Sequence, residues 1–215
     1  MPTIYHRSRC EMVGTLRFAH PTQLSCAERT LVGLRGMREA CKTQRTHKDS
    51  YLMDIPSSVR PLFLAAGWQS GRRMRVDGRV PELHLAHSIL QEVGGLHVGR
   101  SEPSGIGCAR SDLEFCFCEA DHKILSTWGE LLRSRLVEVA EVHNRHGWLI
   151  VDEAGRCFGA SQIHDAFYFE GQTFGEAVER LLLGRKVRPM LRPDQHQVEL
   201  YGETFTRGHP AIFEY

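Results

Sequence analysis

Residues 147–184, GWLIVDEAGRCFGASQIHDAFYFEGQTFGEAVERLLLG, carry the densest structural signals of the chain. An apolar run from Trp148 to Val151 ends at residues 152–155, Asp-Glu-Ala-Gly. Asp at the first position and Gly at the fourth are typical of a type I turn, because the carboxylate bonds nearby backbone N–H groups. Apolar and aromatic residues at 157–158 and 166–169 indicate two more strands. We therefore expect a β-hairpin followed by a third strand.

The same stretch closes with a capped amphipathic helix. Thr173 and Glu176 form a capping box, in which the Thr hydroxyl and the Glu carboxylate each accept from a backbone N–H near the helix start. Apolar residues follow at helical spacing, and Gly184 stands where a left-handed C-terminal cap is expected. No catalytic acid, nucleophile or ligand cluster interrupts these signals. The stretch reads as a scaffold rather than as a catalytic site.

This pattern resembles the C-terminal signature of the SUKH superfamily of bacterial immunity proteins, in its third class. That signature is an apolar strand, Asp-Glu-x-Gly-Arg, an aromatic return strand and a Phe-x-Glu-Ala-x-x-x-Leu-Leu-x-Gly helix, found here at 152–156 and 174–184. The N-terminal signature is similar to residues 64–73 and 89–96, so the resemblance covers roughly residues 54–190. The residues that carry it are Gly67, Trp68, Arg72, Gly94, Gly95, Asp152, Gly155 and Gly184.

The resemblance implies an α+β domain at residues 53–190, with a mostly antiparallel sheet and short helices packed on one face. It also implies a cytoplasmic immunity protein that binds and neutralises a cognate polymorphic toxin, such as a nuclease or deaminase, without catalysis or a cofactor. We expect a monomer in the absence of toxin, with no direct binding of nucleic acid. Two alternatives stay open. One is an intracellular interaction or scaffold module of the same fold. The other is a small hydrolase or nucleotide-binding enzyme, which His84, His87, His122 or Cys118 meeting in one concave site would support.

Composition places the chain among ordinary globular proteins. Its 215 residues suit one domain plus an extension, and no apolar run approaches the roughly 20 residues of a membrane span. The N-terminus also lacks the apolar core of a secretory signal. Seven cysteines without a repeating spacing favour reduced thiols over a disulfide framework.

The first 52 residues differ in charge from the rest. They hold nine basic and four acidic residues, which makes them basic, whereas the remainder carries a net negative charge. Three interpretations of this extension stay open: a helix that starts at a capping box of Ser25 and Glu28, a disordered segment, or a gene-model artefact with native translation from Met53. Residues 191–215 are expected to form a C-terminal tail.

Two further helices are indicated between the signatures. Pro81 is expected to open one, and a third capping box, Thr127 with Glu130, is expected to start another. Before them, Gly67 and Trp68 suit the C′ and C″ positions of a Schellman motif. Residues 113–118 alternate in polarity like a half-buried strand.

Metal and catalytic sites are weakly indicated. His84 and His87 lie three residues apart, but no third ligand accompanies them at a defined spacing. Cys108, Cys116, Cys118 and His122 lack the Cys-x-x-Cys spacing of a zinc site. We therefore expect no metal and no cofactor.

Binding is assigned instead to an acidic surface. Many toxins that act on nucleic acids are basic, so the negative charge of residues 53–215 suggests a docking face for them. The candidate docking residues are Glu114, Glu119, Asp121, Asp165 and Glu170.

Overall fold

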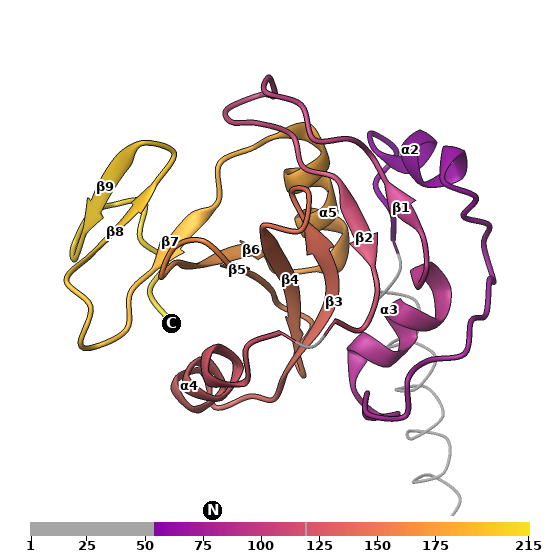
Figure 1. Ribbon diagram of the computed structural model, residues 1–215, viewed down its shortest axis with the longest axis horizontal. Helices are drawn as coiled ribbons and strands as arrows, with labels where there is room; N and C mark the ends of the chain where they lie inside the picture. Colours follow the sequence, from indigo (N-terminus) through magenta and orange to yellow (C-terminus); the bar gives the residue numbers. More distant parts are fainter. Residues whose placement is uncertain (1–53, 119) are drawn as a thin grey trace, which may run out of the picture. The chain divides into compact units, whose positions relative to one another are not determined.

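A computed structural model describes residues 54–118 and 120–215, so the three interpretations of residues 1–52 lie outside the described part of the chain. Seven antiparallel strands form one sheet, in which each strand pairs with the strand that follows it in the sequence (Figure 1). The strands are β1 (His97–Val98), β2 (Leu113–Phe115), β3 (Leu136–Val142), β4 (Gly147–Asp152), β5 (Cys157–Ser161), β6 (Phe167–Gly171) and β7 (Arg188–Met190). The helices in the described ranges are α2 (Arg60–Ala65), α3 (Leu85–Val93), α4 (His122–Leu132) and α5 (Phe174–Leu183). The α+β class with a mostly antiparallel sheet is confirmed.

The turn between β4 and β5 is built on Asp152, whose side chain is fully buried. Its Oδ1 accepts from the backbone N–H groups of Ala154 at 3.0 Å and Arg156 at 2.8 Å. Its Oδ2 accepts from Arg156 Nε at 2.7 Å. Gly155 takes a φ of 89°, a conformation that costs a residue with a Cβ about 1 kcal/mol or more. Local side-chain chemistry therefore fixes the hairpin.

Helix α5 begins and ends where the sequence predicts. Thr173 Oγ1 accepts from Glu176 N at 3.2 Å, and Gly184 ends the helix in the left-handed region. The reciprocal contact differs by one residue, because Glu176 Oε2 accepts from Gln172 N at 2.8 Å rather than from the N–H of Thr173. The apolar face of α5 packs on β5 and β6.

Helix α2 ends in the predicted Schellman motif. Trp68 N donates to Phe63 O at 2.9 Å, Gly67 N donates to Leu64 O at 3.0 Å, and Gly67 has a φ of 91°. The Trp68 side chain is 9% exposed and belongs to the same buried cluster as Phe63. The motif thus anchors the start of the domain in the core.

Helices cover both faces of the sheet. The prediction that the helices pack on one face holds for α2, α3 and α5, whose apolar side chains share one buried cluster with that face of the sheet, and it does not hold for α4. Helix α4 packs on the opposite face, where Trp128 stacks on Phe167 of β6 with ring centroids 4.3 Å apart. Helix α4 also starts earlier than predicted, because Asp121 caps it by accepting from Lys123 N at 2.8 Å. The prediction that Thr127 caps this helix is therefore wrong.

The C-terminal residues form structure beyond the expected tail. Strands β8 (Gln197–Leu200) and β9 (Glu203–Thr206) pair as an antiparallel hairpin. Its buried side chains form a separate small cluster with Leu191 and Ile212. The chain then returns to the sheet, where Phe213 stacks on Phe169 at 4.0 Å between ring centroids.

Candidate binding groove

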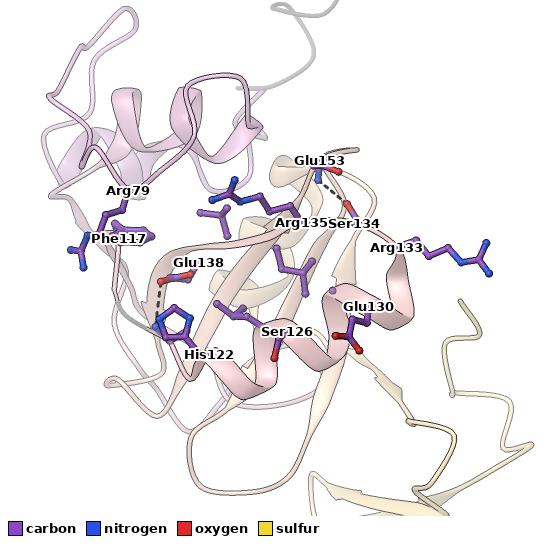
Figure 2. Close-up of a pocket in the computed structure, with 15 residues that line it drawn as sticks. Arg79, Phe117, His122, Ser126, Glu130, Arg133, Ser134, Arg135, Glu138 and Glu153 are labelled. Atoms are coloured by element: carbon purple, nitrogen blue, oxygen red, sulfur yellow. Dashed lines mark hydrogen bonds between the residues drawn. The ribbon is translucent and has the colours of Figure 1, made fainter. Parts of the chain in front are cut away.

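A groove of about 800 Å³ runs between α4 and the first half of β3 (Figure 2). Residues 120–130 of α4 and its N-terminal approach form one wall, and residues 136–138 of β3 form the other. Arg79 and Phe117 lie at one end, and Glu153 lies at the other. We call this feature the α4–β3 groove.

The groove follows from the way α4 packs. The apolar side of α4, which includes Trp128, packs on the sheet. The side of the helix that carries Ser126 and Glu130 therefore lies beside β3. Arg133 is the C-cap of the helix and has a φ of 51°, and Ser134 N donates to Gly129 O at 3.1 Å. This left-handed reversal returns the chain directly into β3, and the space between helix and strand remains open.

A buried carboxylate lies in the groove wall. Glu138 of β3 is 3% exposed, and its Oε1 accepts from the backbone N–H of Ala120 at 3.3 Å. Burial raises the pKa of Glu138, while that hydrogen bond and the charges of His122 and Arg79 oppose the rise. In Figure 2, Glu138 and His122 extend toward the same end of the groove from opposite walls.

Exposed side chains of both signs line the rim of the groove. Arg79 pairs with Asp77 through two bonds of 3.0 Å, and its guanidinium lies 4.8 Å from the centroid of the Phe117 ring. Arg133, Arg135, Glu130 and Glu153 are the other charged groups of the rim, and all four are exposed. The groove therefore offers a charge pattern rather than a single sign.

The hydroxyl groups of the groove are engaged by the backbone. Ser126 Oγ donates to Lys123 O at 3.2 Å, and Ser134 Oγ accepts from Glu153 N at 3.2 Å. Among the described residues, no group of three His, Cys, Asp or Glu side chains is arranged to hold a metal ion. The arrangement suits recognition of a partner's side chains through shape and charge.

Three predicted docking residues lie on the surface. Asp121 is exposed at the start of α4. Glu114 accepts two bonds of 2.9 Å from Arg145, and Asp165 accepts two bonds of 2.7 Å from Arg192. The Arg192 guanidinium lowers the pKa of the Asp165 carboxyl. Two of these three acids are thus already neutralised within the chain.

The prediction for Glu170 is wrong, and Glu119 lies outside the described residues. Glu170 is 1% exposed and lines a second cavity of about 350 Å³, together with Tyr168, Tyr201 and Cys108. Within residues 54–118 and 120–215, its Oε2 has no hydrogen-bond partner, and burial raises the pKa of Glu170 to about 8. A group so enclosed is not available to a docking protein.

The histidines weighed as ligands do not line the α4–β3 groove together. His84 is the N-cap of α3: its Nδ1 accepts from Ala86 N at 3.1 Å, and its Nε2 lies 3.0 Å from Arg135 O. This arrangement places the proton on Nε2, and burial lowers the pKa of His84. His122 lines the α4–β3 groove, whereas His84, His87 and Cys118 do not. The four side chains proposed for an enzyme site therefore do not share this groove.

The signature residues lie in turns and at helix caps. Arg72 Nη1 donates to Glu92 O at 3.1 Å and to Gly94 O at 2.8 Å, which ties the loop after α2 to the end of α3. Gly95 has a φ of 77°.

Sequence reasoning missed Glu138, although a signal was present. The strand LVEVAEV places this acid between two valines that belong to the buried core, and an acid at such a position calls for an explanation.

Comparison with known proteins gives one match, to a protein family. A family model described as SUKH-3 immunity protein matches residues 55–184, more than half of the chain. A search of the curated proteins and a search of the solved structures gave no match. In the described part of the chain, no helix has the length and apolar character required to span a membrane.

Proposed function

Because this chain belongs to the SUKH-3 immunity protein family, we propose that it neutralises a cognate toxin in the cytoplasm by binding it, without catalysis, and that the α4–β3 groove receives the toxin. The family match supports the immunity function, and the buried carboxylate beside an open groove supports the α4–β3 groove as the surface that binds the toxin. The toxin is proposed to be a nuclease or deaminase with a basic binding surface, since such enzymes act on nucleic acids.

The groove favours a basic side chain of the partner. Glu138 has a backbone donor at 3.3 Å, and its burial strengthens any further charge interaction that it makes. A Lys or Arg side chain entering the groove would supply charge-assisted hydrogen bonds, which are roughly twice as strong as neutral ones. The carboxylate would then be ionised and paired.

The exposed rim is suited to selecting one toxin among related ones. Glu130 and Glu153 attract basic groups, whereas Arg133 and Arg135 repel them. A partner must therefore present both signs in a matching order. We extend the docking surface to Asp121, at the start of α4, and to Glu114 and Asp165, whose internal pairs with Arg145 and Arg192 would have to rearrange or remain at the edge.

Co-expression with the product of the adjacent upstream gene tests both parts of the proposal. Growth rescue and co-purification are measured for the full chain, for Glu130→Lys with Glu153→Lys, and for Glu199→Lys with Glu214→Lys. The second pair is exposed, lies outside the groove and changes the net charge by the same amount.

We expect rescue by the unchanged chain and by the Glu199/Glu214 pair, with loss of rescue and of the complex for the Glu130/Glu153 pair. Persistent toxicity despite expression of the unchanged chain would overturn the immunity function toward that neighbour. Full rescue by the Glu130/Glu153 pair, or equal loss by both pairs, would overturn the placement in the groove.

A further inference from the structure

Two thiols lie almost within bonding distance beside the α4–β3 groove. The Sγ atoms of Cys116 and Cys118 are 2.7 Å apart, which is about 0.7 Å longer than a disulfide bond. Both residues are half-buried, and Phe117 between them lines the groove. Cys108 and Cys157 are the other cysteines in the described ranges, and both are free thiols.

The local backbone explains why the two thiols meet. Strand β2 ends at Phe115, and Cys116 N still donates to Val139 O at 3.2 Å. Side chains two residues apart in extended chain leave from the same side. Just after them, Ala120 N donates to Cys118 O at 2.9 Å, and Cys118 Sγ lies 3.4 Å from Cys116 O.

The two thiols differ in acidity because one donates to the other. A hydrogen bond from Cys118 lowers the pKa of Cys116, against the effect of burial. The same hydrogen bond and burial raise the pKa of Cys118. Cys116 is therefore the thiol that reaches the nucleophilic thiolate form first.

We propose that Cys116 and Cys118 are a redox modification site that forms a reversible intramolecular disulfide. With a low-molecular-weight disulfide as the oxidant, the Cys116 thiolate attacks one sulfur, forms a mixed disulfide and expels one thiolate. Cys118 then loses its proton to solvent, attacks Cys116 Sγ and expels the second thiolate. Two protein thiols are oxidised and one oxidant disulfide is reduced to two thiols.

The bond would close a small ring through the backbone of Phe117. Phe117 lines the groove and lies beneath the Arg79 guanidinium, 4.8 Å from its ring centroid. Oxidation therefore fixes the end of the groove at which Phe117 lies. The consequence of this disulfide for toxin binding rests on the proposed function, whereas the formation of the disulfide does not.

Oxidation of the reduced full chain by glutathione disulfide tests the inference. Free thiols are alkylated at each time point, and peptides spanning residues 111–123 are examined by mass spectrometry before and after treatment with dithiothreitol. Cys116→Ser and Cys118→Ser are compared with Cys108→Ser, which removes another half-buried thiol elsewhere in the fold.

We expect most chains to carry the Cys116–Cys118 bond, to lose it on reduction, and to keep forming it in the Cys108→Ser variant. In Cys118→Ser and in Cys116→Ser, the remaining thiol should keep glutathione attached, because no second thiol is present to expel it. Persistence of both thiols in the unchanged chain, or pairing of either with another cysteine, would overturn the proposal.

Discussion

The Asp112 side chain accepts a hydrogen bond of 2.8 Å from the backbone N–H of Asn144, 32 residues further along the chain. Asn144 lies between His143 and Arg145 in three consecutive residues with φ between 53° and 65°, an unfavourable conformation for residues with a Cβ. Asp112 is 7% exposed and also accepts from Ser101 Oγ at 2.6 Å. A single buried carboxylate thus holds the left-handed turn between β3 and β4.

Replacing this carboxylate should destabilise the domain. We expect Asp112→Ala to lower the free energy of unfolding by about 2–4 kcal/mol, because buried donors lose a charged acceptor and the strained turn loses its support. Urea denaturation measures the change. Asp194→Ala, in which an exposed acid paired to Arg192 is lost, should change stability by less than about 1 kcal/mol. Equal effects of the two variants would contradict this role for Asp112.

Glu170 should make stability depend on pH in the direction opposite to an ordinary carboxylate. Burial raises the pKa of this group to about 8, so between about pH 4.5 and 8 the folded chain holds a proton that the unfolded chain has released. Its contribution to stability is present below pH 4.5 and is lost as the pH rises, by up to about 1.4 kcal/mol per pH unit.

The variant Glu170→Gln removes this titration. Relative to the unchanged chain, it should gain roughly 3–4 kcal/mol of stability between pH 5 and pH 8, whatever its absolute stability. Urea denaturation at both pH values gives the difference, with Glu199→Gln on exposed β8 as the control. A difference that does not change with pH would show that Glu170 is ionised in the folded chain.

Two glycines with similar backbone angles should tolerate alanine differently. Gly184 has a φ of 66° and Gly202 a φ of 72°, so both replacements cost about 1 kcal/mol of backbone strain. A Cβ at Gly184 would also lie 2.4 Å from Cys108 O, whereas a Cβ at Gly202 would have open space. Thermal unfolding should therefore show a loss for Gly184→Ala at least twice that for Gly202→Ala. Similar losses would mean that the loop at Cys108 moves freely.

Glu138 should determine affinity for the toxin more than the rate of association. We expect Glu138→Gln to weaken the complex about tenfold or more through faster dissociation, because the groove then lacks a buried negative charge. Surface plasmon resonance with the co-purified toxin separates the two rates. Glu114→Gln, at the surface beside Arg145, should mainly alter the salt dependence of association. Slower association with unchanged dissociation in Glu138→Gln would contradict this assignment.

The elements predicted correctly from sequence depend on contacts within a few residues. The turn at Asp152, the caps of α5 and the Schellman motif at Gly67 each use side chains and backbone groups close in sequence. Hydrogen bonds of this kind can be predicted from residue patterns in the sequence. The hairpin of β8 and β9 was missed because its turn residues, Tyr201 and Gly202, are not among the strong two-residue turn signals.

The candidate site depends on tertiary structure and was therefore less accessible. Glu170 comes directly after the aromatic strand predicted at 166–169, so the sequence suggests an exposed acid. In the structure, α5 and the segments around Cys108 and Tyr201 enclose it. The start of α4 was misplaced because Thr127 and Glu130 satisfy the pattern of a capping box equally well inside a helix. Without that helix boundary, the groove against β3 could not be inferred.

The two ends of the sheet restrict how any partner can attach. Strand β1 is only two residues long, and strand β7 carries Pro189, which has no N–H to donate to an added strand. Recruitment of an extended peptide by β-strand addition is therefore disfavoured at both margins, and the same features guard against edge-to-edge self-association. A partner must therefore bind through side chains of this protein. A change in which partner is recognised then requires substitutions on the surface and no change in strand pairing.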